Sequence, residues 1–111
     1  MATVTTDGAI VEQVLNELAR FYAAPQKFRT VSSFDREHGE YLLVDEGWDG
    51  YKRIHNTWAH VAVTGGKVYI HGDNTQDGIA PDLIAAGIPA SRIVLSFKHP
   101  SLRYDTAFAT V

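Results

Sequence analysis

The stretch VTGGKV, residues 63–68, decides the fold of this 111-residue chain. A Gly-Gly pair readily adopts the positive φ angles that a two-residue β-turn requires. The apolar residues on both sides of the pair recur at every second position, as they do in strands that bury one face. The stretch therefore predicts a β-hairpin whose turn is formed by Gly65 and Gly66.

Counting outward from this turn predicts the register of the two strands. One face is expected to be core, because a slip of one residue would expose all of its valines and its isoleucine to solvent. The core face carries Val61, Val63, Val68 and Ile70. The predicted cross-strand pairs are Val63–Val68, Ala62–Tyr69, Val61–Ile70, His60–His71 and Trp58–Asp73, so the second face carries Trp58, His60, Ala62, Tyr69, His71 and Asp73.

Outside the hairpin, the apolar pattern predicts two helices and further strands. The first helix shows the three- and four-residue spacing of an amphipathic helix and ends before Pro25. The second is short, and Gly87 and Pro89 end it. Elsewhere the period is two, as in strands. The expected helices cover residues 9–22 and about 75–86, and the expected strands cover 28–34, 40–44, 52–63, a segment from 68 onward and 92–97.

Consecutive strands joined by short turns favour an antiparallel sheet. We therefore expect an α+β fold with an antiparallel β-sheet of four to five strands and two helices packed on one face. The length fits a single hydrophobic core, so residues 1–111 are expected to form one domain. The other sheet face, with its aromatic and imidazole side chains, would then be partly open.

The stretch GWDG, residues 47–50, lies between two predicted strands and indicates a turn. A tryptophan at such a position must either cap the edge of a core or face a partner. We expect Trp48 to seal the edge of the sheet, while Gly47 and Gly50 allow the turn. In the alternative, Trp48 and Asp49 form part of a partner-binding surface.

The charge balance argues against an autonomous nucleic-acid-binding module. The net charge is −3 and the ten Lys and Arg residues are scattered, whereas DNA-binding proteins cluster theirs. The absence of cysteine excludes disulfides and thiol chemistry and is typical of a reducing compartment. No secretory signal and no apolar run of about 20 residues occur. We therefore expect a cytoplasmic protein without membrane contact.

His60, His71 and Asp73 are the candidate metal site. Two imidazoles and a carboxylate with open positions suit iron or zinc. The competing interpretation places these side chains on a half-buried face or at a protein interface, where aromatic residues are enriched. The chain has no Gly-x-Ser-x-Gly elbow, phosphate loop or His-Glu-x-x-His motif. We favour the interface and expect no catalytic residue, no metal and no cofactor.

Several short motifs in a fixed order resemble the XisI family, the fdxN element excision controlling factor of cyanobacteria. The resemblance covers about residues 11–109, and each motif alone is weak while the ordered set is specific. In the family pattern, glutamine is frequent at the position of His71, which disfavours a metal role. The motifs are GWDG (47–50) with KR (52–53), HVAV (60–63), VYI (68–70), DGIA (77–80), AGIP (86–89) and IVLSF (93–97).

The resemblance implies a non-catalytic accessory protein. XisI members act with a site-specific recombinase and with a second accessory factor, XisH, whose fold is similar to that of endonucleases. We expect this chain to control excision of a DNA element by binding an XisH-like partner, with the recombinase involved indirectly and no direct contact with nucleic acid. The open face could also support a homodimer. The candidate partner-binding residues are Trp48, Asp49, Trp58, His60, Tyr69 and His71, and the alternative function is a small metal-dependent enzyme using His60, His71 and Asp73.

Overall fold

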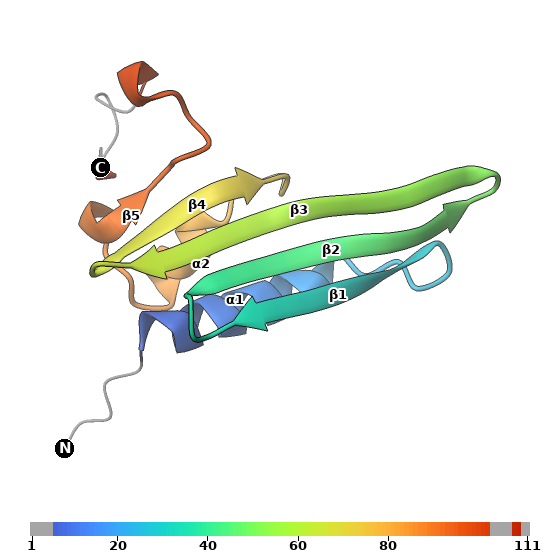
Figure 1. Cartoon of the computed structure of the whole chain (residues 1–111), viewed down its shortest axis with the longest axis horizontal. Coiled ribbons are helices and arrows are strands. Elements are labelled where there is room, and N and C mark those ends of the chain that lie inside the picture. Colours follow the sequence, from blue (N-terminus) through green and yellow to red (C-terminus); the bar gives the residue numbers. More distant parts are fainter. Residues whose placement is uncertain (1–5, 103–107, 110–111) are drawn as a thin grey trace.

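The computed structural model describes residues 6–102 and 108–109, and it combines one five-stranded sheet with two α-helices (Figure 1). The strand order is β1-β2-β3-β4-β5. The elements are α1 (Asp7–Phe21), β1 (Phe28–Asp35), β2 (Glu40–Asp49), β3 (Lys52–Thr64), β4 (Lys67–Asp73), α2 (Ala80–Ala85), the 3₁₀ turn η1 (Ala90–Arg92), β5 (Ile93–Val94) and the 3₁₀ turn η2 (Pro100–Leu102).

The predicted α+β class is confirmed, and the sheet is mixed. Strands β1 to β4 pair antiparallel through short turns. Strand β5 instead runs parallel to β4, because α2 carries the chain back across the sheet before β5 begins. Only Ile93 and Val94 of the predicted strand 92–97 pair with β4.

The core lies between the sheet and the two helices, which cover the same face (Figure 1). Helix α1 begins at a Thr6 cap, whose hydroxyl oxygen accepts a 3.1 Å hydrogen bond from the Ala9 N–H. Its apolar stripe faces the strands, as its spacing predicts. Each fully buried aliphatic side chain here contributes about 1.5–3 kcal/mol. The stripe comprises Ile10, Val11, Val14, Leu15 and Leu18.

The β3–β4 hairpin turns at Gly65 and Gly66, whose φ angles are +59° and +77°, as predicted. The pairs Val63–Val68, Ala62–Tyr69 and Val61–Ile70 are also confirmed. Beyond them a β-bulge shifts the register. His71 is the additional residue on β4, so His60 lies opposite Gly72 and Ala59 lies opposite Asp73. The predicted pairs His60–His71 and Trp58–Asp73 are therefore wrong.

A second β-bulge lies between β2 and β3. Leu43 pairs with Ala59 and Val44 pairs with Thr57, which leaves Trp58 as the additional residue. Trp58 and its neighbour Ala59 are both buried, although strict alternation would place them on opposite faces. The bulge thus turns the indole of Trp58 to the helix side of the sheet.

The predicted turn over residues 47–50 is also wrong. Strand β2 continues to Asp49, and the chain reverses at Gly50 and Tyr51, with Gly50 at φ +63°. Gly47 instead serves a close approach, because a Cβ atom there would lie 2.4 Å from the Lys27 carbonyl oxygen. The resulting β2–β3 ribbon extends past β1 and the helices (Figure 1). No helix in the described part of the chain is long and apolar enough to cross a membrane.

Candidate functional site

The sheet face opposite the helices carries most of the predicted partner-binding residues, and we call it the open face. Alternation along β2 and β3, together with the cross-strand register, assigns its members. No helix of the described chain lies over it (Figure 1). The open face comprises Val31, Leu42, Val44, Trp48, Arg53, His60, Ala62, Tyr69 and His71.

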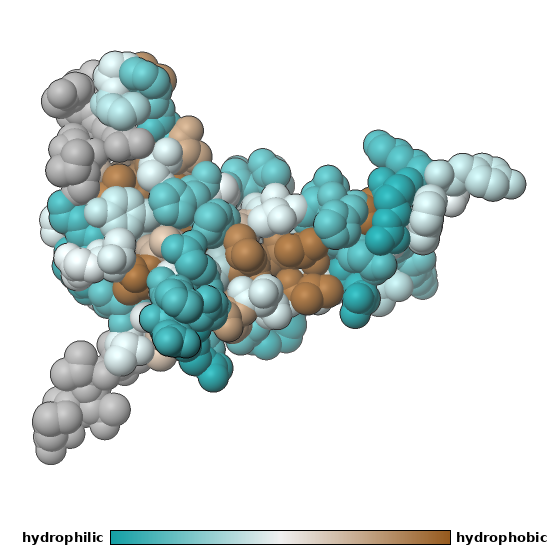
Figure 2. Space-filling model, in the orientation of Figure 1, coloured by the Kyte–Doolittle hydropathy of each residue, from teal (hydrophilic) through white to brown (hydrophobic). Residues whose placement is uncertain are grey.

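The centre of the open face is apolar. Val31 lies opposite Val44, and Leu42 lies between β1 and His60 of β3. These three aliphatic side chains are only half-buried. Figure 2 shows hydrophobic side chains gathered in the middle of this face, with hydrophilic groups around them. A contiguous apolar patch that remains accessible marks an interaction surface.

At one end of the open face, two imidazoles lie side by side. The ring centroids of His60 and His71 are 4.9 Å apart, because the bulge brings them together diagonally rather than directly opposite. His60 Nε2 lies 2.7 Å from Glu40 Oε1, and His71 Nδ1 lies 2.7 Å from Ser96 Oγ. Both rings are therefore oriented by protein groups.

The ring of Tyr69 continues this cluster. It lies parallel to that of His71, with 6.0 Å between centroids and 8° between planes. Burial lowers the pKa of His71, the adjacent His60 lowers it further, and Glu40 acts in the opposite direction. The lowered pKa favours the uncharged form of His71, and an uncharged imidazole parallel to a tyrosine ring suits contact with another protein.

At the other end of the open face, Trp48 is 58% exposed, so it does not seal the edge of the sheet. The guanidinium of its cross-strand neighbour Arg53 lies 5.2 Å from the indole centroid. Glu46 binds Arg29 at 3.1 Å and Arg53 at 3.3 Å, and these arginines hold the pKa of Glu46 below its usual range. Asp49 is exposed beside the ribbon tip. The two predicted surfaces, around Trp48 and around His60, therefore share one face.

Trp58 does not belong to this surface, so that prediction is wrong. Its side chain is only 8% exposed and lies on the helix side, where its ring meets Tyr22, the C-cap of α1, edge-on at 5.7 Å. Its Nε1–H donates a 2.9 Å hydrogen bond to Asp45 Oδ1. Trp58 is a core residue.

The predicted metal set is not assembled. The Asp73 carboxylate accepts hydrogen bonds from the Thr75 N–H and hydroxyl at 3.0 and 2.6 Å and from the Ile79 N–H at 2.7 Å. It orders the loop before α2 instead of joining His60 and His71. The part of the chain that the structure describes holds no group of three His, Cys, Asp or Glu residues suited to a metal ion.

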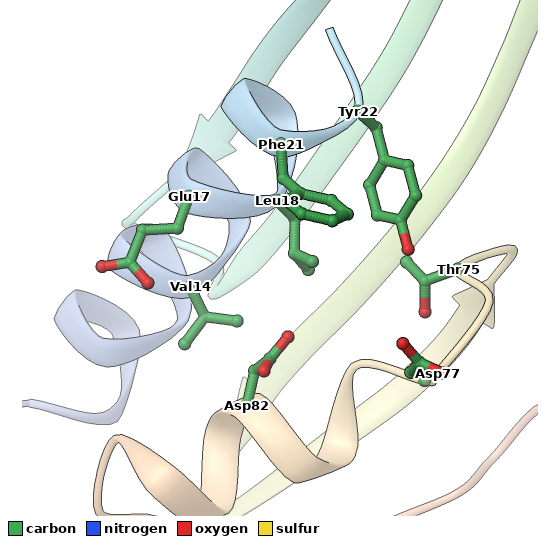
Figure 3. Close-up of a pocket in the computed structure, with 9 residues that line it drawn as sticks. Val14, Glu17, Leu18, Phe21, Tyr22, Thr75, Asp77 and Asp82 are labelled. Carbon is green, nitrogen blue, oxygen red and sulfur yellow. The ribbon is translucent and has the colours of Figure 1, made fainter.

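Sequence reasoning missed Glu40, Ser96 and Arg53. Each lies five or more positions from the residue that it contacts, so only the folded register brings the pairs together. A separate pocket of about 290 Å³ lies on the helix side (Figure 3). Its apolar side is formed by α1 and includes Phe21, and the carboxylate of Asp82 extends toward it from α2 (Figure 3). This pocket contains none of the predicted site residues.

Comparison with known proteins agrees with this architecture. The model of the family described as XisI protein matches residues 1–110, nearly the whole chain. The chain belongs to the XisI family. The match includes the first ten residues, which the motifs alone do not reach. No curated protein matches the chain.

Two crystal structures from Anabaena variabilis ATCC 29413 share the XisI fold. A XisI-like protein is 25% identical, with a TM-score of 0.86, over 94% of this chain and 95% of that one. The fdxN element excision controlling factor XisI is 29% identical, with a TM-score of 0.72, over 96% of this chain and 100% of that one. The resemblance inferred from the motifs is thus confirmed at the level of family and fold.

Proposed function

We propose that this XisI protein is a non-catalytic accessory factor that controls site-specific excision of a DNA element by binding an XisH-like, nuclease-fold protein. The family and the name of the second crystal structure support the role in excision control. The observation that carries the mode of action is the open face, whose apolar centre is flanked by Trp48 at one end and by the His60–His71 cluster at the other.

The composition of the open face fits a protein partner. Interfaces combine an apolar centre with aromatic and arginine residues and a polar rim. Here Val31, Leu42 and Val44 provide the centre, while Trp48 stacked on Arg53 provides an exposed aromatic anchor. His60 and His71 already contact Glu40 and Ser96, so docking would not leave these rings unsatisfied.

The charges of the open face do not favour direct DNA binding. Arg29 and Arg53 share Glu46, which neutralises part of the positive charge that a phosphate backbone would need. The whole chain carries a net charge of −3. DNA affinity depends on several unpaired cations that displace counterions. The proposed effect on DNA therefore passes through the partner.

A pair of matched variants tests the proposal. Trp48→Ala removes an exposed aromatic residue from the open face, and Phe21→Ala removes one that is 79% exposed on the helix side. Co-expression with an XisH-like protein from the same organism should yield a complex. Trp48→Ala should weaken this complex about tenfold or more, as truncation of an interface tryptophan does, and Phe21→Ala should not.

The outcomes distinguish an error in the proposed partner from an error in the proposed docking surface. If the two proteins never co-purify and show no binding by calorimetry, the proposed partner is wrong. If they bind but both variants behave like wild type, the partner stands and the open face is not where it docks. Salt-dependent binding of duplex DNA by the isolated chain would instead favour direct recognition.

A further inference from the structure

Strand β1 forms a long, regular edge of the sheet. It pairs with β2 alone among the described strands, over eight residues and without a register shift. In an antiparallel pair, alternate residues direct their backbone N–H and C=O groups toward the neighbour. The 3.1 Å bond from the Trp48 N–H to the Lys27 carbonyl shows that odd-numbered residues face β2. The backbones of Thr30, Ser32 and Phe34 therefore face outward.

This edge lacks most of the features that normally prevent strand addition, and its two charged residues, Arg29 and Asp35, have opposite signs. Protective edges carry proline, inward-pointing lysine or a bulge, or they are covered or very short. Strand β1 contains no proline and no lysine, and its pairing is uninterrupted. The opposite edge strand, β5, spans only two residues. The accessible template for strand addition is thus β1.

Beside the β1 edge lies a groove of about 380 Å³ between β1 and α1. Ala19 of α1 and Ala23, just after the helix, form part of one wall beside Asn16 and Arg20, and Phe28 and Thr30 line the strand side. Because small residues permit close approach, side chains of an added strand have space on the helix side of the sheet. The groove therefore allows the sheet to continue past β1.

We propose that β1 pairs antiparallel with β1 of a second copy of this chain, about a two-fold axis at Ser32. In this arrangement the numbers of facing residues sum to 64, so Arg29 faces Asp35 of the second copy. Both side chains lie on the open-face side, because both are odd-numbered. Arg29 binds Glu46 through Nε at 3.1 Å, and its side chain is 74% exposed. Asp35 already accepts a 3.2 Å bond from the His38 N–H and lies 2.7 Å from His38 Nδ1, but its side chain is 51% exposed and can also meet Arg29. The strand is thus complementary to itself in charge and in hydrogen bonding.

Such a dimer has one continuous sheet with both pairs of helices on the same side. Val31 of each copy lies next to the dyad, so the two apolar centres adjoin. The interface uses backbone groups at the edge and leaves Trp48 and His71 accessible. This inference therefore does not depend on the proposed function, and it is tested on the chain alone.

Sedimentation velocity of the full chain over a range of concentrations is the first measurement. We expect a dimer for wild type and a monomer for Ser32→Pro, which removes an outward N–H that β2 does not use. The matched control Ser32→Ala keeps that N–H and should remain dimeric. Thermal unfolding followed by circular dichroism shows that each variant is folded.

Charge exchange between copies gives a sharper result. Arg29→Asp alone and Asp35→Arg alone each place like charges opposite one another twice per dimer and should weaken self-association about tenfold. A mixture of the two variants restores both attractive pairs and should form the heterodimer. Lys52→Asp, at the ribbon tip, serves as the control for added negative charge.

Three results would overturn the proposal. The first is a wild-type chain that stays monomeric at every concentration. The second is a dimer that survives Ser32→Pro. The third is a dimer that Tyr69→Ser abolishes while the charge variants leave it intact, because that result would place the contact on the open face.

Discussion

The indole nitrogen of Trp58 and the carboxylate of Asp45 are joined by a 2.9 Å hydrogen bond at the margin of the core. The same carboxylate oxygen accepts a 2.7 Å bond from the Thr30 hydroxyl. Asp45 therefore connects β1, β2 and β3 at the point where the bulge turns Trp58 inward. This bond network explains how a large indole is accommodated in a strand that would otherwise direct it to the open face.

Asp45→Ala should destabilise the fold by about 1–3 kcal/mol, because it leaves the Trp58 N–H without an acceptor in a buried position. Asp45→Asn keeps a carbonyl oxygen and should cost less. Urea unfolding followed by tryptophan fluorescence measures both. Asp49→Ala, on the exposed end of the same strand, is the control and should change stability by less than about 0.5 kcal/mol.

Gly47→Ala and Gly72→Ala form a second matched pair, since both glycines lie in strands and neither has a positive φ angle. A Cβ at Gly47 would lie 2.4 Å from the Lys27 carbonyl oxygen and 2.6 Å from Phe28 Cα, whereas at Gly72 the nearest atom is 3.5 Å away. Gly47→Ala should therefore cost about 1–3 kcal/mol through overpacking. Equal melting temperatures for the two variants would contradict this account.

Asp73→Ala should destabilise the chain by about 1–3 kcal/mol, because the Thr75 and Ile79 N–H groups lose their shared acceptor. This loss of stability should be the same in EDTA and in added zinc, since the Asp73 carboxylate accepts hydrogen bonds from protein groups only. Thermal unfolding under both conditions measures it. A loss that disappears in EDTA, together with stoichiometric metal in the purified wild type, would restore the metal-dependent enzyme as a hypothesis.

The His60–His71 pair predicts a pH-dependent stability. Burial and the neighbouring His60 lower the pKa of His71 in the folded state, so the unfolded chain binds the proton more readily. The stability that His71 contributes is fully present above the ordinary histidine pKa of about 6.5. It is lost as the pH falls through the lower pKa that His71 has in the folded state. Stability should therefore decrease between pH 7 and pH 5, above the range where carboxylates titrate.

The variant His71→Gln should flatten this pH dependence, and His55→Gln, an exposed site on β3, should not. Chemical denaturation at several pH values measures the slope, and NMR titration of the ring protons measures the pKa directly. A His71 pKa at or above about 6.5 would show that the ring is not desolvated as the structure indicates.

Local signals in the sequence predicted much of this fold. The Gly65–Gly66 turn, the three pairs next to it and helix α1 depend on residues that are close in the chain, so short-range patterns suffice. The parallel direction of β5 depends on the crossover through α2, and no short-range pattern of strands and turns encodes it.

The site was predicted less well, and the two bulges explain why. Alternation assumes that every strand residue has one partner, but His71 and Trp58 are each additional to the register. One bulge removes Trp58 from the surface, and the other separates His60 from direct opposition to His71. Bulges depend on packing between strands, as when Tyr22 receives the indole, and that packing is formed only in the folded chain.

The β2–β3 ribbon makes the open face rigid at one end and flexible at the other. At Tyr41 and Leu43 the strand is supported by buried helix contacts, whereas residues 48–53 project past the helices and are exposed. Backbone amide hydrogens should therefore exchange with solvent slowly at Tyr41 and Leu43 and quickly at residues 48–53 of the same ribbon. A docking protein would meet a rigid surface at the histidine end and a flexible one around Trp48. Association can therefore begin at the histidine end, and the ribbon around Trp48 adjusts its conformation afterwards.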